Sequence, residues 1–158
     1  MSNEIVFDIE TQNTFADVEN DFKKFRVSVV SVYSYLTDSY KSFTEGELNK
    51  LWPIIEKADR IIGYNSEHFD LPILNNYYLG DLSVFPHLDL MKVIKDSIGL
   101  RIKLSNVAES TLDNVTKSAD GLQAITWWKE GKIDEIKKYC EQDVRVTKEI
   151  YEFGKLNK

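Results

Sequence analysis

Two acidic side chains separated by one residue follow the apolar run at residues 5–7. If this segment is a strand, Asp8 and Glu10 point to the same side, because side chains alternate between the faces of a strand. Two ionised carboxylates that close together repel each other, and a divalent cation bound through oxygen relieves the repulsion. The pair therefore indicates a metal site, although a strand end that emerges into water would show the same pattern.

A third carboxylate, Asp70, comes after a short apolar segment at residues 60–64 and two positions before Pro72. Ligand sites in folds of sheets and helices lie at the ends of strands, which favours a functional role. An aspartate near a helix N-terminus also stabilises the helix without any catalysis. Taken alone, Asp70 is explained more simply by this second interpretation.

Tyr139 and Asp143 lie four residues apart in a long helical pattern at residues 132–153, so they share one face of the predicted helix. Asp143 stands at the edge of the apolar stripe, where a charge is costly unless it is paired or bound to a metal. A solvated aspartate beside a packed tyrosine ring is the alternative, and the position of the stripe disfavours it. The stripe consists of Ile133, Ile136, Cys140, Val144, Thr147 and Tyr151.

The four carboxylates and the tyrosine together suggest a chemistry. Asp8, Glu10, Asp70 and Asp143 supply enough oxygen ligands for two divalent ions about 3.5–4 Å apart, an arrangement that suits phosphodiester hydrolysis. Oxygen ligands favour Mg²⁺ or Mn²⁺ over Zn²⁺. A tyrosine hydroxyl, with an ordinary pKa of about 10, is a poor base. We expect Tyr139 instead to orient a water molecule that a metal ion has already acidified.

Aromatic and basic side chains offer weaker signals for nucleic-acid binding. Trp127 and Trp128, which follow the polar segment 117–121, could stack on bases, but paired tryptophans on a helix more often belong to the core or its rim. A sparse set of lysines is either the path of a nucleic-acid strand or an ordinary solvated surface. These are Lys103, Lys117, Lys129, Lys132, Lys137 and Lys138.

Composition sets limits on the class of protein. The chain has 158 residues, of which 42% are hydrophobic and 29% charged, as in one globular domain, and we expect a single domain over 1–158. No apolar run approaches the ~20 residues that span a bilayer, and the N-terminus has no secretory pattern. A single cysteine, Cys140, fits a reducing cytoplasm. The net charge of −6 argues against a general nucleic-acid binder, unless bound cations neutralise the acids locally.

The predicted elements alternate between strands and helices. After the first strand and a polar loop at 12–26, strands are predicted at 27–36 and 40–43. A capping box at Thr44 and Glu47 then opens a helix that Pro53 makes irregular. A buried strand at 60–64, a helix at 69–78 and a strand leading into a helix at 86–95 follow. Short helices at 104–110 and 123–129 precede the long helix. This order predicts a mixed sheet with helices on its faces, an α/β fold.

Three segments resemble the motifs of one family of nucleases. Phe7-Asp8-Ile9-Glu10-Thr11 is similar to the first motif of the DEDD 3′–5′ exonucleases of the ribonuclease H-like superfamily. Residues 64–74, with the sequence YNSEHFDLPIL, resemble the second, and Tyr139-Cys140-Glu141-Gln142-Asp143 resembles the third in its tyrosine (DEDDy) form. The histidine form requires a histidine at position 138, where this chain has lysine. The second and third motifs are especially similar to those of stand-alone predicted exonucleases and of proofreading domains of family B DNA polymerases.

The resemblance implies a fold and a role for each residue. It implies a ribonuclease H-like, five-stranded mixed sheet, with three antiparallel strands followed by parallel ones and helices on both faces. Asp8 bridges two Mg²⁺ or Mn²⁺ ions; Glu10 and Asp143 complete the site of the water-activating ion; Asp70 holds the other; and Tyr139 orients the water. The residues expected near the terminal nucleotide are Thr11, Asn65 and Phe69, the last mainly through packing.

The resulting function is a metal-dependent 3′–5′ exonuclease that acts at the 3′ ends of single-stranded DNA or RNA. The alternative is a catalytically inactive ribonuclease H-like module that binds nucleic acid or a protein, but such a module is expected to have lost at least one metal carboxylate. An endonuclease of the ribonuclease H type shares the first acids and does not account for Tyr139. The choice between DNA and RNA, and any protein partner, stay open.

Overall fold

The computed structural model describes residues 2–99, 102–104, 106–107 and 121–156 of the chain. It contains five strands in the described part: β1 (Glu4–Thr11), β2 (Val27–Ser34), β3 (Ser39–Thr44), β4 (Arg60–Gly63) and β5 (His87–Asp89). The described α-helices are α1 (Trp52–Lys57), α2 (Leu71–Leu74), α3 (Leu90–Ile98), α5 (Gly121–Lys129) and α6 (Ile133–Leu156). Short helical segments of the 3-10 type occupy Phe22–Lys24, Glu45–Lys50 and Leu82–Val84.

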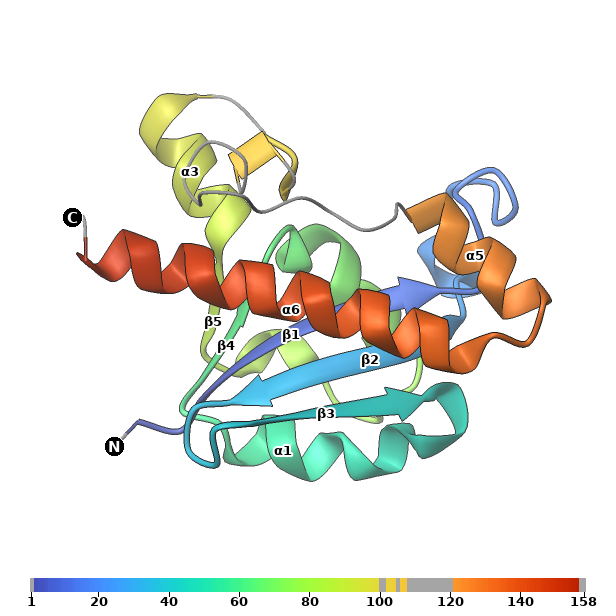
Figure 1. The fold of residues 1–158 in the computed structure, drawn as a ribbon, viewed down its shortest axis with the longest axis horizontal. Coiled ribbons are helices and arrows are strands. Elements are labelled where there is room, and N and C mark those ends of the chain that lie inside the picture. The colour runs from blue at the N-terminus through green and yellow to red at the C-terminus, as the bar shows by residue number, and fades with distance from the viewer. Residues whose placement is uncertain (1, 100–101, 105, 108–120, 157–158) are drawn as a thin grey trace.

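The five strands form one mixed sheet in the order β3-β2-β1-β4-β5 (Figure 1). β1 pairs antiparallel with β2, and β2 pairs antiparallel with β3. On the other side of β1, the strands β4 and β5 run parallel to it. The predicted α/β fold, with three antiparallel strands followed by parallel ones, is confirmed.

Side chains of β1 alternate between two cores, one on each face of the sheet. Ile5, Phe7 and Ile9 pack into a cluster that includes residues of α1 and α2. Val6 packs on the opposite face, in a cluster with Val144 of α6 and other residues of that helix. Figure 1 shows α6 running across this second face, in front of β1 and β2. Because side chains alternate along a strand, the positions of Asp8 and Glu10 are on the α6 side.

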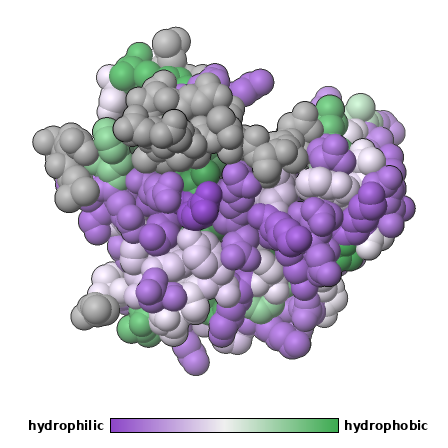
Figure 2. All heavy atoms as spheres, in the orientation of Figure 1, coloured by the Kyte–Doolittle hydropathy of each residue, from purple (hydrophilic) through white to green (hydrophobic). Residues whose placement is uncertain are grey.

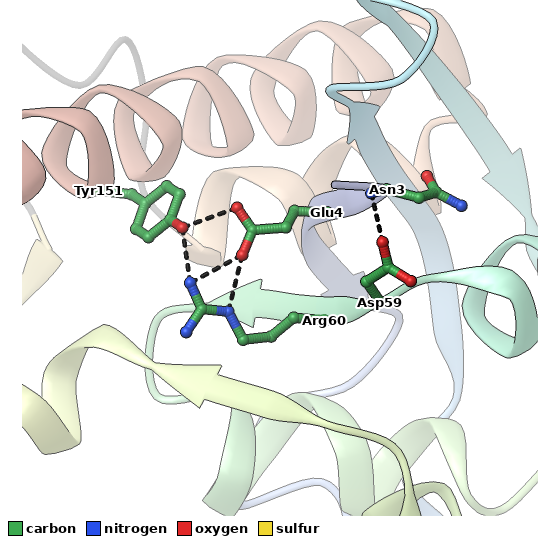
Figure 3. Close-up of polar contacts among 5 residues, drawn as sticks. All are labelled: Asn3, Glu4, Asp59, Arg60 and Tyr151. Carbon is green, nitrogen blue, oxygen red and sulfur yellow. Dashed lines mark hydrogen bonds and ion pairs between the residues drawn. The ribbon is translucent and has the colours of Figure 1, made fainter. Parts of the chain in front are cut away.

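A polar network ties the start of β1 to the C-terminal part of α6 (Figure 3). The guanidinium group of Arg60 donates to Glu4 Oε2 from Nε at 2.8 Å, and its Nη2 lies 2.7 Å from the same oxygen. The Tyr151 hydroxyl donates to Glu4 Oε1 at 2.7 Å and accepts from Arg60 Nη2 at 2.6 Å. Beside it, the Asn3 amide donates to Asp59 Oδ2 at 2.7 Å. Strand β1, strand β4 and helix α6 are therefore held in one relative position.

The predicted capping box exists, but it opens a 3-10 turn and not the α-helix itself. Glu47 Oε1 accepts from the Thr44 amide at 3.0 Å, and the turn Glu45–Lys50 follows. Pro53 lies in the first turn of α1, where its missing N–H costs no helical hydrogen bond. The irregularity predicted at Pro53 thus takes the form of a helix that starts late.

The helix predicted at 69–78 is wrong in its extent. A π-helical turn at Ser66–Asp70 precedes α2, which ends at Leu74. Asn75 accounts for the early end: its side chain donates to the Gly80 carbonyl at 3.2 Å and accepts from the Leu82 amide at 2.8 Å. Such side-chain bonds to the backbone compete with helix continuation.

Other predicted helices agree with the structure within the described residues. The strand and helix predicted at 86–95 correspond to β5 and α3, and α3 continues to Ile98. The helices predicted at 123–129 and 132–153 correspond to α5 and α6. Of the helix predicted at 104–110, residues 104, 106 and 107 are helical, and the rest lies outside the described residues. The outer side of α6 is exposed and charged, and Figure 2 shows hydrophilic side chains across this face of the molecule. Among the described helices, none is both long and apolar enough to span a bilayer.

Candidate active site

The first part of the site is the end of β1. Asp8 pairs in register with Ser31 of β2, and Glu10 with Val29, on the face that α6 covers. The register with β2 shifts between Glu10 and Thr11, an irregularity of the kind that turns a strand end away from its neighbour. Glu10 and Thr11 are buried, whereas Asp8 is half-buried. The Thr11 hydroxyl donates to the Asn13 carbonyl at 2.8 Å, which fixes the chain as it leaves the strand.

The second part is the turn that carries Asp70. After β4 the chain passes through Asn65, which has a left-handed backbone (φ 57°), and the Leu71 amide then closes the π-helical turn on the Ser66 carbonyl. The start of this turn comes so close to Gly63 that a Cβ atom there would lie 2.5 Å from Ser66 Oγ. The π-helical turn, which is wider than an α-helical one, ends at Asp70, and Asp70 lines the same cavity as Asp8 and Glu10 of β1.

The Asp70 carboxyl is deeply buried, with 3% of the residue exposed. Its Oδ2 atom has no hydrogen-bond partner among the described residues. Burial raises the pKa of this carboxyl well above its ordinary value, and the negative charges of Asp89 and Asp143 raise it further. A buried carboxyl with an oxygen left over is a group that a bound cation would stabilise.

The third part is the first half of α6, which places Tyr139 and Asp143 one turn apart on the helix. Asp143 is 4% exposed, and its backbone carbonyl accepts from the Thr147 hydroxyl at 2.8 Å. The ring of Tyr139 packs against Trp127 of α5, with ring centroids 6.3 Å apart in an edge-on arrangement. Helix α5 therefore fixes the ring that the sequence predicts at the reaction site.

All eight residues that the sequence predicts for the site line one cavity of about 490 Å³. Helix α6, strand β1 and the turn after β4, which are far apart in the sequence, meet there. The predicted residues in its lining are Asp8, Glu10, Thr11, Asn65, Phe69, Asp70, Tyr139 and Asp143. A cavity of this size accommodates a small ligand or the end of a chain.

The single cysteine lies directly behind the acidic pair. One ligand atom each of Asp8, Glu10 and Cys140 lies within 4.8 Å of the others. The Cys140 thiol donates to the Asp8 carbonyl at 3.3 Å. Burial, followed by the charges of Asp8 and Glu10, raises the pKa of this thiol well above its ordinary value. Cys140 is therefore a neutral donor to the strand, which leaves the cavity with carboxylates as its hard metal ligands.

One wall of the cavity is apolar, and the sequence did not point to it. Phe15, Leu122 and Ile125 line it together with Phe69. The Phe69 ring lies 5.7 Å from that of Phe15 and 5.6 Å from that of Phe25 between centroids, so its packing role and its place in the lining coexist. Phe15 belongs to the loop predicted at 12–26, and only its contacts with distant aromatics reveal its position.

The tryptophans and lysines have less to do with the cavity. Trp127 and Trp128 pack against the cluster of Val29, Ile136 and Cys140, in agreement with the core or rim interpretation. Two of the lysines considered for the strand path form ion pairs on the surface: Lys132 with Glu130 at 3.4 Å and Lys138 with Glu135 at 3.8 Å. Lys117 lies outside the described residues.

Sequence reasoning also missed Asp89, a buried carboxylate at the end of β5. It accepts hydrogen bonds from the turn that carries Asp70, as described below. The signal was present, because Asp89 ends a strand that runs parallel to β4, and polar residues at the ends of parallel strands meet at one edge of a sheet.

The comparisons with known proteins agree with this architecture. A family model described as the RNase_H superfamily matches residues 5–153. No curated protein matches the sequence. Among solved structures, the family B DNA polymerase of the hyperthermophilic archaeon Pyrobaculum calidifontis is similar, with a TM-score of 0.70 and 18% sequence identity. The match covers 93% of this chain and 24% of that polymerase, so the likeness is one of fold over part of a much longer protein.

Proposed function

Because the chain belongs to the RNase H superfamily, we propose that it is a metal-dependent exonuclease that removes nucleotides from 3′ ends. The substrate is single-stranded DNA or RNA, and the reaction is hydrolysis of the terminal phosphodiester bond. One observation carries the proposal: four carboxylates from three separate segments line a single cavity with a tyrosine. They are Asp8, Glu10, Asp70 and Asp143.

The donor set fits hard divalent ions such as Mg²⁺ or Mn²⁺. The supporting observation is Asp70, whose buried Oδ2 has no hydrogen-bond partner among the described residues and whose pKa burial raises. Asp8, Glu10 and Asp143 would hold one ion, and Asp70 with Asp8 would hold a second. When bound, such ions supply acidification of a water molecule and stabilisation of charge on the phosphate and leaving oxygens.

Residues of the chain orient the water and position the substrate. Tyr139, whose ring packs edge-on against that of Trp127, orients the attacking water through its hydroxyl. The turn at Asn65 and the backbone at Thr11 position the terminal nucleotide between them. The apolar wall that Phe15 and Phe69 form offers surface to a base or sugar.

The test uses oligonucleotides labelled at either end, as single-stranded DNA, single-stranded RNA and duplexes with 3′ overhangs, each with Mg²⁺ and with Mn²⁺. A 3′–5′ exonuclease yields a ladder of shortened products from the 5′-labelled strand and a labelled mononucleotide at once from the 3′-labelled strand. Asp8→Asn abolishes both. Asp96→Asn, on the exposed side of α3, is the matched control and retains both.

Two results would refute the proposal. One is the absence of shortening with either metal and every substrate, which would leave the inactive binding module as the better interpretation. The other is equal shortening by the wild type and the Asp8→Asn variant, since the activity would then come from a contaminant. Products that appear first in the middle of the strand would instead indicate an endonuclease.

A further inference from the structure

Asp89 is a buried carboxylate whose two oxygens accept three backbone hydrogen bonds. Asp89 Oδ1 accepts from the Asn65 amide at 2.8 Å and from the Met91 amide at 3.0 Å. Asp89 Oδ2 accepts from the Glu67 amide at 3.1 Å. The bond to Met91 caps helix α3, which any good N-cap residue could do. The other two bonds cross to a different segment of the chain.

That segment is the turn that delivers Asp70 to the cavity. Asn65 and Glu67 lie at its beginning, and Asp70 is its last residue. The turn has a second attachment to β5, because Ser66 Oγ and His87 Nε2 share a hydrogen bond of 2.7 Å. Both attachments hold a stretch in which Asn65 adopts a left-handed backbone, a conformation that is uncommon for a residue other than glycine.

We infer that Asp89 is a positioning residue, which holds the turn at 65–70 so that Asp70 can bind a metal ion. The inference rests on the proposed function and names a residue that acts on the site from outside the cavity lining. Groups that orient metal ligands through hydrogen bonds commonly change metal affinity by about 10–100-fold when they are replaced. The charge of Asp89 acts in the same direction, since it adds to the negative potential that attracts a cation to Asp70.

Two substitutions separate the capping of α3 from the attachment of the turn. In Asp89→Asn the side-chain shape is kept, but the amide nitrogen then faces at least one backbone N–H donor. In Asp89→Ser the hydroxyl can still cap α3 through Met91, because serine is a preferred N-cap, and circular dichroism checks that the variant is folded. Neither variant can accept from both Asn65 and Glu67 as the carboxylate does.

The control is Asp81→Asn. Asp81 also caps a short helical turn, where it accepts from the Ser83 amide at 2.9 Å and from the Ser83 hydroxyl at 2.7 Å. It is exposed, and within the described residues its side chain bonds to Ser83 and not to the turn at 65–70. The control therefore replaces a capping carboxylate in the same way as Asp89→Asn, but it leaves the attachment of the turn at 65–70 unchanged.

The measurement is Mn²⁺ binding by titration calorimetry, together with the Mn²⁺ concentration that gives half-maximal cleavage. We expect both Asp89 variants to bind Mn²⁺ about tenfold or more weakly than the wild type, with cleavage largely restored at saturating Mn²⁺. The Asp81→Asn variant keeps the wild-type affinity.

The inference is overturned if a folded Asp89→Ser variant binds Mn²⁺ with an affinity within about twofold of the wild type. It is also overturned if the Asp81→Asn control loses as much affinity, or if the wild type binds no Mn²⁺. If the wild type binds Mn²⁺ but cleaves no oligonucleotide, the proposed nuclease function fails. The comparison of affinities then still decides the role of Asp89, so the two failures are distinguishable.

Discussion

At the scale of single residues, Tyr139 is the group whose proposed role is most open to a clean test. Tyr139→Phe keeps the ring that packs against Trp127 and removes only the hydroxyl. We expect cleavage to slow by about tenfold to a thousandfold, the range for loss of one positioned catalytic group. Mn²⁺ affinity stays close to that of the wild type. Single-turnover kinetics measure the cleavage rate, and metal titration measures the Mn²⁺ affinity. A large loss of metal affinity would contradict the water-orienting role.

Asp70 is the residue at which stability and activity should conflict. Its pKa in the folded protein is raised by burial, so the folded state without metal holds the proton more tightly than the unfolded state. The stability from this protonation is complete at low pH and is lost as pH rises through the folded pKa. We expect Asp70→Asn to unfold at a higher denaturant concentration than the wild type at neutral pH in EDTA, and to cleave nothing. Equal midpoints near pH 4 and a gap that widens toward pH 8 would support this sign.

At the scale of elements, the approach of β4 to the π-helical turn depends on Gly63. A Cβ atom at this position would lie 2.6 Å from Ser66 Cβ and 3.0 Å from Phe7 Cε1. Gly63→Ala should lower the free energy of unfolding by about 1–3 kcal/mol, as overpacking does, and should weaken Mn²⁺ binding because the turn moves. Gly46→Ala is the matched control, since nothing lies within 4 Å of the added atom. Equal stability of the two variants by chemical denaturation would contradict the close approach.

The network of Glu4, Arg60 and Tyr151 joins three elements, and its central hydroxyl can be removed alone. Tyr151→Phe breaks the bonds to Glu4 and Arg60, at 2.7 and 2.6 Å (Figure 3). Hydrogen bonds to charged groups contribute about 1.5–3 kcal/mol, and we expect a loss in this range by urea denaturation. Tyr78→Phe removes a similar bond to the exposed Glu56, at 2.7 Å, and should cost less stability than Tyr151→Phe, because water replaces the exposed bond. A reversed order of the two variants would count against the network.

The sequence correctly predicted the features of the elements that depend on local periodicity. The shared face of Asp8 and Glu10 follows from strand alternation, and that of Tyr139 and Asp143 from helical spacing. The route of Asp70 does not follow from such patterns. It depends on a turn that Asp89 holds from β5, through contacts between residues more than twenty positions apart.

At the scale of the whole molecule, metal binding and folding should be linked. The carboxylates of the cavity come from β1, the turn after β4 and α6, so the complete ligand set exists only in the folded chain. A ligand that binds only the folded state stabilises it by about 2.7 kcal/mol at a hundred times its dissociation constant. We expect Mn²⁺ to raise the melting temperature of the wild type but not of Asp8→Asn, as measured by scanning calorimetry with EDTA as the reference. An equal rise in both would indicate binding elsewhere.

The network at Glu4 also has a consequence for how the chain can vary in length. Strand β1 runs from this anchor to Glu10, and α6 runs from Asp143 to the same anchor at Tyr151. An extra residue between Asp143 and Tyr151 would rotate one end of the helix by about 100° and shift it by about 1.5 Å relative to the other. We therefore expect an insertion in either interval to disrupt the site. The positions of the acids relative to one another therefore depend on the lengths of β1 and α6, which are joined at Glu4 and Tyr151.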